Sequence, residues 1–294
     1  MDILKIFILV LINAGGEGKT TIAELIRVLF QLSVCEHLGL DADSGVYALM
    51  DSSGKDLITK AVGWSVGPDK APEIVQAAGG LPVVMDTGAN TLASQREVVE
   101  LLPVLRKRFE KEGYRTIALL PISPNKKAAA GALADLAPKL ADFETYVVKN
   151  NRDGSDEFGE VTDAYPQILI RHLAPGLNAY LTRSKRSIID AILRPEPGYV
   201  KAGAHIAEWV RAFAREPYVQ DLLGAELCER AISQFPRPPR SRRFELRKYD
   251  DVNDAAIERT EHNTHVLNLL DHYGWSAAGL RGAADELERC PYVF

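Results

Sequence analysis

The feature that most constrains the fold of this 294-residue chain is a glycine-rich turn, "NAGGEGKTT" at residues 13–21, which directly follows the apolar run "IFILVLI". Such an unbroken apolar run is typical of a parallel strand that is buried on both faces. After the turn, apolar residues recur at helical spacing through "TTIAELIRVLFQL". A strand, a glycine-rich turn and a helix in direct succession predict the first unit of a parallel α/β sheet.

The same turn predicts an anion site. Backbone N–H groups of a glycine-rich turn at the start of a helix attract phosphate oxygens. In that arrangement Lys19 would reach the terminal phosphates of a nucleotide, and the Thr20 hydroxyl would bind Mg²⁺. The usual pattern of such loops, G-x-x-x-x-G-K-[ST], has a glycine where this chain has Asn13. The alternative is a tight turn that only happens to contain lysine and threonine, and the strand–turn–helix context favours the phosphate loop.

Strand and helix patterns alternate through the residues that follow. Their order predicts a mostly parallel sheet with helices on both faces. Strands are expected at 80–90, 114–123, 143–151 and 166–175, and helices at 96–113, 126–142 and 202–216.

The pattern changes past residue 216, where "FPRPPRSRRFELRK" is too rich in proline and arginine for a regular helix. The tail from Tyr249 is acidic and helical in pattern. We therefore expect a core domain over residues 1–216, followed over residues 217–294 by a linker and a helical extension.

Charge and cysteine content restrict the class of protein. A net charge of −5 argues against binding nucleic acid through overall charge. The segment Arg237–Lys248 carries six basic residues, so a local contact with DNA phosphates or with an acidic partner stays open beside a plain linker. The three cysteines are odd in number and widely spaced, which favours a reducing cytoplasm over a disulfide framework.

The apolar N-terminal run needs a separate interpretation. It is too short to span a bilayer. It also follows an acidic residue, Asp2, and has no small-residue cleavage site, so it does not fit a signal peptide. We expect a cytoplasmic protein without a membrane span.

Four segments together carry a family resemblance: "GGEGKTT", "LDADSG", "PVVMDTGAN" and "YVVKNN". They resemble the P-loop NTPases of the MinD/ParA type, a SIMIBI-class group with a deviant Walker A loop. That group usually writes its loop K-G-G-x-G-K-[ST], without a glycine at the position of Asn13. The resemblance covers roughly residues 3–215 and implies a P-loop α/β fold, ATP and Mg²⁺ as cofactors, and a nucleotide-dependent homodimer. The D-x-G-A-x segment is most similar to the TraL/StbB-like branch of conjugal-transfer and plasmid-stability ATPases.

The resemblance also implies roles for individual residues. Lys19 and Asp43 would be catalytic, with Asp43 positioning the attacking water. Mg²⁺ would be held by Thr20, Asp41 and Asp86. The nucleotide-binding residues implied are Gly15, Gly16, Glu17, Gly18, Lys19, Thr20, Thr21, Asn150 and Asn151, the two asparagines offering an amide to the adenine edge.

Each of these roles has an ordinary structural alternative. Asp41 and Asp43 could belong to a solvated turn after a strand, and Asp86 could cap a turn. The pair Asn150 and Asn151, followed by "RDGS", is also a common loop signal. The phosphate loop upstream and the separation of 24 residues between Lys19 and Asp43 favour function for Asp41 and Asp43. A ligand site is expected at the carboxyl ends of parallel strands, which favours function for Asp86. For the asparagines both interpretations stay open.

One departure from the family bears on turnover. The signature lysine that opens the family's loop is Ala14 here. In relatives that lysine reaches the partner's phosphates across a dimer, and alanine supplies no such charge. Glu17 adds a negative charge near the expected phosphate site. We therefore predict slow hydrolysis, unless another cation substitutes.

The leading functional hypothesis is a cytoplasmic switch ATPase that acts, with a plasmid or conjugation protein as partner, in plasmid partition, plasmid stability or conjugal transfer. The alternative is a nucleotide-binding adaptor without useful hydrolysis, which docks through residues 217–294. A metabolic ligase or small-molecule kinase on a related fold would need its own substrate pocket, and no pattern here identifies one.

Overall fold

The computed structural model describes residues 4–12, 14–42, 59–61, 71–87, 96–158, 164–184, 187–196 and 198–235. Its strands are β1 Ile6–Val10, β2 Leu38–Ala42, β3 Thr59–Ala61, β4 Val83–Thr87, β5 Arg115–Ile122, β6 Glu144–Asn150 and β7 Gln167–Ile170. Its helices are α1 Lys19–Leu32, α3 Ala71–Ala78, α5 Arg96–Lys111, α6 Lys127–Leu136, α7 Pro175–Ser184, α8 Ile188–Leu193, α9 Val200–Ala214, α10 Pro217–Leu223 and α11 Ala225–Ser233, with a 3₁₀ turn at Ala137–Leu140.

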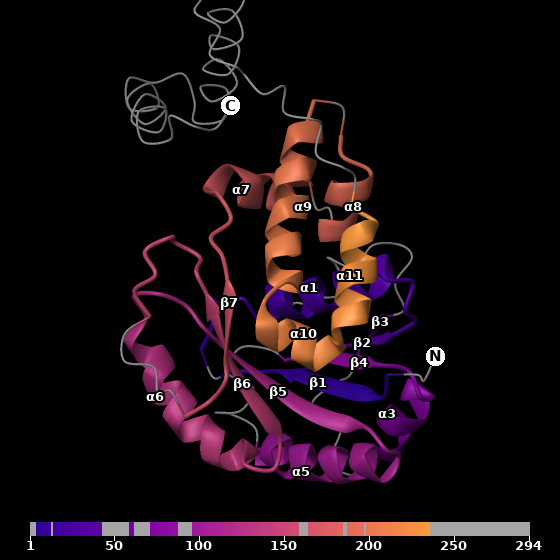
Figure 1. Cartoon of the computed structure of the whole chain (residues 1–294). Coiled ribbons are helices and arrows are strands. Elements are labelled where there is room, and N and C mark those ends of the chain that lie inside the picture. Colours follow the sequence, from indigo (N-terminus) through magenta and orange to yellow (C-terminus); the bar gives the residue numbers. More distant parts are fainter. Residues whose placement is uncertain are drawn as a thin grey trace, which may run out of the picture. The chain divides into compact units, whose positions relative to one another are not determined.

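The strands form one sheet in the order β3-β2-β4-β1-β5-β6-β7. Every described pairing in it is parallel. β1, which leads into the glycine-rich turn, lies between β4 and β5 and is buried along its whole length. The predicted parallel α/β fold is therefore confirmed (Figure 1).

Helices cover both faces of the sheet. Side chains alternate between the two faces along a strand, so Ile6, Ile8 and Val10 pack into one core cluster while Phe7 and Leu9 pack into the other. The first cluster includes residues of α1, α8, α9, α10 and α11. The second includes residues of α3, α5 and α6. Figure 1 shows α5 and α6 on the side of the sheet opposite to α9 and α11.

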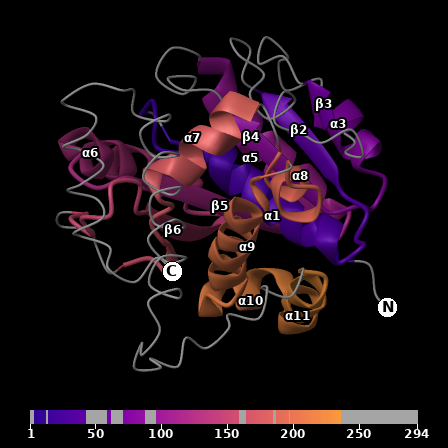
Figure 2. The same ribbon diagram turned by 90° about the horizontal axis from the view of Figure 1, so that it is seen from above.

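The chain divides into two compact units, Met1–Pro238 and Pro239–Phe294. α10 and α11 follow residue 216, and their apolar residues, among them Val219, Leu222 and Cys228, belong to the same core cluster as residues of α1 and α9. Figure 2 shows the ribbons of α10 and α11 at the end of α9. The domain division predicted after residue 216 stays a prediction, because residues 236–294, including the Arg237–Lys248 segment, lie outside the described residues.

None of the helices in the described part of the chain is long and apolar enough to cross a membrane.

Two ionisable side chains of α1, Glu24 and Arg27, are hydrogen-bonded to residues outside the helix. The Arg27 side chain is only 1% exposed, and its Nε donates to Nε2 of His37 over 3.4 Å. Glu24, one turn earlier and partly buried, accepts a 2.7 Å hydrogen bond from the backbone N–H of Ile188, at the start of α8. Burial raises the pKa of Glu24 to about 7 and lowers the pKa of His37 to about 4.

The two pKa shifts make the free energy of unfolding depend on pH in opposite directions. The folded-state pKa of Glu24 exceeds its ordinary value of 4.5, so its contribution is full below pH 4.5 and is lost as the pH rises to about 7. His37 has a depressed pKa, so its contribution is present above its ordinary value of 6.5 and is lost as the pH falls to about 4.

Glu24→Gln should therefore gain stability relative to the wild type as the pH rises. Glutamine keeps an oxygen for the Ile188 N–H but has no charge to desolvate. We expect the difference in unfolding free energy to shift by roughly 2–3 kcal/mol in favour of the variant between pH 4.5 and pH 8. Urea unfolding at a series of pH values measures this shift, and a difference that does not change with pH would contradict it.

Candidate functional site

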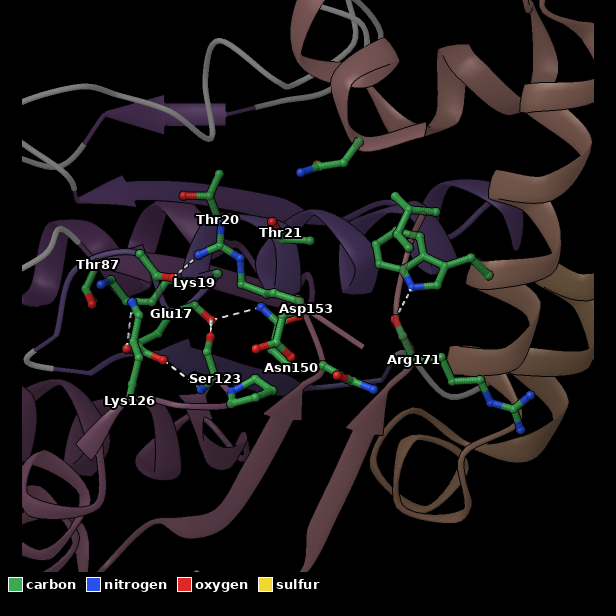
Figure 3. Close-up of a pocket in the computed structure, with 18 residues that line it drawn as sticks. Glu17, Lys19, Thr20, Thr21, Thr87, Ser123, Lys126, Asn150, Asp153 and Arg171 are labelled. Carbon is green, nitrogen blue, oxygen red and sulfur yellow. Dashed lines mark hydrogen bonds and ion pairs between the residues drawn. The ribbon is translucent and has the colours of Figure 1, made fainter. Parts of the chain in front are cut away.

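A cavity of about 600 Å³ opens at the carboxyl edge of the sheet. Residues 16–21 of the glycine-rich turn line it, together with residues that follow β5, β6 and β7 (Figure 3). In open parallel sheets, ligands bind in the crevice outside the carboxyl ends of the strands. The cavity is therefore where the fold itself predicts a site.

Glycine is required at the sharpest point of the turn. Gly18 immediately precedes α1 and has φ of +88°, and Gly16 has φ of +71°. This left-handed backbone region favours glycine. A Cβ added at Gly18 would lie 2.1 Å from Nδ2 of Asn150, so space as well as backbone angle excludes a side chain there.

Lys19 is folded back over the turn. Its side chain is 7% exposed, and Nζ donates to the carbonyl oxygens of Ala14 at 3.2 Å and Ile12 at 3.5 Å. Lys19 also lines the cavity. A lysine ammonium is thus held among the loop carbonyls, next to the space that a phosphate would enter.

The predicted metal residues lie on neighbouring elements. Oγ1 of Thr20 donates to Oδ2 of Asp86 over 2.7 Å. Asp86 is the second-to-last residue of β4, and Asp41 on β2 is its direct neighbour in the parallel register. Both carboxylates are buried, at 1% and 0% exposure, and neither is among the described residues that line the cavity.

These oxygen groups suit a magnesium ion. Mg²⁺ prefers oxygen ligands and is usually bound through one or two carboxylates together with substrate phosphates. The described residues hold no group of three or more His, Cys, Asp or Glu side chains that could form a complete metal cage. Thr20 and Asp86 therefore fit a metal that is shared with a bound phosphate.

Glu17 is placed differently from what its position in the loop suggests. Its side chain is fully buried, and Oε2 accepts a 2.7 Å hydrogen bond from the backbone N–H of Ser123. Oε1 lies 3.1 Å from Nζ of Lys126 (Figure 3). The negative charge expected near the phosphate site is thus paired with the Lys126 ammonium.

Asn150 and Asn151 both line the cavity, and each is 6% exposed. Nδ2 of Asn150 donates to the carbonyl of Glu17 over 2.9 Å, and Nδ2 of Asn151 donates to Oδ1 of Asp156 over 2.7 Å. Both amide nitrogens are therefore bonded within the protein. Recognition of adenine by these amides stays a prediction.

Asn13, in the glycine-rich turn, and Asp43, the predicted catalytic carboxylate, lie outside the described residues. The catalytic role of Asp43 stays a prediction.

The structure adds cavity residues that the sequence argument missed. They follow β5, β6 and β7 or lie on α7 and α9, and they are Ser123, Pro124, Lys126, Arg152, Asp153, Arg171, Leu173, Asn178 and Trp209. Nε1 of Trp209 donates to the carbonyl of Arg171 over 2.7 Å. The rule that strand ends share one edge was available from the sequence, and it would have drawn attention to the residues after β5 and β7.

Comparison with known proteins gives structural similarity only. No protein-family model and no curated protein matches the chain. Among solved structures, the chain is similar to the septum site-determining protein MinD from Pyrococcus horikoshii OT3 complexed with Mg-ADP, at 15% identity over 75% of this chain and 98% of that one, with a TM-score of 0.45. It is similar to a ParA family ATPase from Chlorobium tepidum TLS, at 12% identity over 71% and 98% of the two chains and a TM-score of 0.44. It is also similar to FlhF complexed with GTP and Mg²⁺, at 12% identity over 58% and 67% and a TM-score of 0.41. Similarity at this level carries no argument about function, which has to come from the site itself.

Proposed function

We propose that the chain is a Mg²⁺-dependent switch ATPase of the MinD/ParA type, which binds ATP in the cavity and hydrolyses it slowly. One observation carries the proposal. The glycine-rich turn closes onto the start of α1, with Lys19 folded over it and Thr20 bonded to Asp86, beside a cavity of about 600 Å³. A cavity of this volume is in the range of small-molecule and cofactor sites.

The residues present match what phosphoryl transfer requires. Such reactions depend on positioning and on electrostatic stabilisation more than on covalent chemistry by the protein. The loop and Lys19 would bind the phosphate oxygens and neutralise charge on the terminal phosphate. Thr20 and Asp86, with Asp41 next to Asp86 in the sheet, would hold a magnesium ion that neutralises further phosphate charge. Asp43 is proposed to orient the attacking water.

Slow turnover and the biological setting belong to the same proposal. Ala14 offers no charge to a bound phosphate, which favours a low rate. A nucleotide-dependent homodimer, and action in plasmid partition, plasmid stability or conjugal transfer, are supported only by the resemblance of the loop and of "PVVMDTGAN" to that family.

Ala14 also favours a second candidate, an adaptor that binds nucleotide without useful hydrolysis and docks through residues 217–294. The two candidates make the same prediction for binding and differ in phosphate release.

The deciding experiment titrates the protein with Mg·ATP, Mg·ADP, Mg·GTP and a non-hydrolysable ATP analogue, while oligomer mass and phosphate release are followed together. We expect an ATP-dependent dimer and phosphate release at roughly 10⁻⁴ to 10⁻² s⁻¹, as in P-loop enzymes that act without a stimulating partner. Lys19→Ala should lower the rate of phosphate release at least about 100-fold, because the lysine ammonium would stabilise charge that develops in the transition state.

The other outcomes are equally informative. Tight ATP binding without release or mass change would establish the adaptor and exclude the switch. Preference for GTP would overturn the choice of base. A wild-type protein that binds none of these nucleotides would contradict both candidates.

A further inference from the structure

Three successive carbonyl groups of the glycine-rich turn are held by side chains from elsewhere in the chain. Nζ of Lys126 donates to the Gly15 carbonyl over 2.9 Å, and Nη1 of Arg152 donates to the Gly16 carbonyl. The third contact is the one from Asn150 to Glu17. Lys126 follows β5, whereas Asn150 ends β6 and Arg152 follows it. Two different strand ends therefore support one short stretch of backbone.

The two cations lie directly against the turn. A Cβ added at Gly16 would lie 3.2 Å from Nζ of Lys126 and 3.5 Å from Nη1 of Arg152. Both side chains also line the cavity. Hydrogen bonds from charged donors are stronger than those between neutral groups, so these contacts fix the backbone more firmly than a neutral side chain would.

Lys126 has a second partner in the turn, because its Nζ also pairs with the buried carboxylate of Glu17. That carboxylate accepts from the backbone N–H of Ser123 as well. The segment after β5 thus holds the turn through a carbonyl and through a side chain at once.

From these contacts we propose that Lys126 and Arg152 are positioning residues that hold the phosphate loop in its nucleotide-binding shape before any nucleotide arrives. In a trans peptide unit the C=O and N–H groups point in opposite directions, and the described chain has no cis peptide bond. Carbonyls fixed toward Lys126, Arg152 and Asn150 therefore turn the N–H groups of residues 16–18 to the other side of the loop, from which they bind phosphate. Because the loop is already ordered, binding energy is not spent on ordering it.

This inference rests on the proposed function for its ligand, Mg·ATP, whereas its first measurement, amide hydrogen exchange, needs no ligand. Amide hydrogen exchange of residues 14–19 is measured in the nucleotide-free protein, and the affinity for Mg·ATP is measured separately. Arg152→Ala should speed exchange of the loop at least about 10-fold and weaken Mg·ATP binding about 10- to 100-fold, the range expected for the loss of one charged hydrogen bond. Arg152→Lys, which can still reach a carbonyl, should recover most of both losses.

The charge control is Lys149→Met. Lys149 lies on β6 next to Asn150, and its ammonium lies over the ring of Phe158 at 5.6 Å, so this variant removes a nearby positive charge without touching the loop. It should change neither readout by more than about three-fold. Equal effects of Arg152→Ala and Lys149→Met would mean that overall charge, and not loop position, controls affinity.

A double variant distinguishes the contact of Lys126 with the Gly15 carbonyl from its contact with the Glu17 carboxylate. Lys126→Met alone leaves the Glu17 carboxylate buried and unpaired, which should lower stability. Glu17→Gln combined with Lys126→Met should restore stability to urea while loop exchange stays fast, because the Gly15 carbonyl is still unsupported. Restored exchange in the double variant would overturn the role of Lys126 as a support for the loop.

Failure of this proposal can be told apart from failure of the proposed function. If the wild type binds no nucleotide, the function fails, yet the exchange measurement still decides whether Arg152 and Lys126 order the loop. If Arg152→Ala weakens binding with unchanged loop exchange, Arg152 contacts the ligand directly, and the positioning role is wrong.

Discussion

Replacing Gly18 with alanine should weaken nucleotide binding at least about 100-fold while the sheet stays folded. The new Cβ would lie 2.1 Å from Nδ2 of Asn150, so the amide has to move and its hydrogen bond to the Glu17 carbonyl is lost. The backbone also keeps φ of +88°, which costs a residue with a Cβ roughly 1–2 kcal/mol. With the lost buried hydrogen bond, we expect a total cost of about 2–4 kcal/mol and at least a 100-fold loss of affinity for Mg·ATP.

Gly80→Ala is the matched control. Gly80 has nearly the same backbone angle, φ of +90°, but a Cβ there would meet no heavy atom within 4 Å among the described residues. Its free energy of unfolding should fall only by the backbone cost of roughly 1–2 kcal/mol, and it should bind nucleotide normally. Calorimetric titration and urea unfolding of both variants test this. If Gly18→Ala binds nucleotide as Gly80→Ala does, the loop does not form the site.

Gly39→Ala should have the largest effect on stability. Gly39 lies in β2, and a Cβ there would be 2.5 Å from Cζ of Arg27 and 2.8 Å from its Nη1. The guanidinium group is almost fully buried, and burial also lowers the pKa of Arg27 to about 10. It cannot move into solvent without disturbing the packing between α1 and the sheet. We expect a loss of roughly 2–4 kcal/mol, typical of an overpacked core with a displaced buried charge.

Thermal unfolding gives the simplest measurement, with an expected fall in Tm of roughly 5–15 °C for a domain of this size. Gly131→Ala serves as the control, because a Cβ at Gly131 would meet no heavy atom within 4 Å in the described structure. Alanine is the better helix former, so this change within α6 should raise stability by up to about 1 kcal/mol. An unchanged Tm for Gly39→Ala would show that Arg27 can be accommodated elsewhere.

Local signals explain why so much of the fold was predictable. The strands expected at 114–123 and 143–151 appear as β5 and β6, and the helix expected at 202–216 appears as α9, each with small differences at the ends. One element has other bounds than expected because of a single residue. The helix expected at 126–142 ends at Leu136 and continues as a 3₁₀ turn that contains Pro138, whose missing N–H removes one bond of the α-helical ladder. β7 is shorter than expected and ends at Ile170.

The residues of the candidate site also divide into those that a local pattern identifies and those that it does not. Gly18, Lys19 and Thr20 were identifiable because the turn, the lysine and the helix start are adjacent in the chain. Lys126 and Arg152 were not, because no local pattern indicates that a side chain will reach a carbonyl more than a hundred residues away. The burial of Glu17 was equally hidden, since its partners come from the segment after β5.

Those long-range contacts bear on when the protein acquires its site during synthesis. The carbonyls of Gly15, Glu17 and Gly16 are bonded by residues that lie 111, 133 and 136 positions later in the chain. Ribosomes add roughly 5–20 residues per second, so the loop leaves the ribosome on the order of ten seconds before its supports do. During that interval the nascent chain carries the complete motif without the strands that shape it. If the proposed function holds, nucleotide would meet a shaped loop only after β5 and β6 have been made.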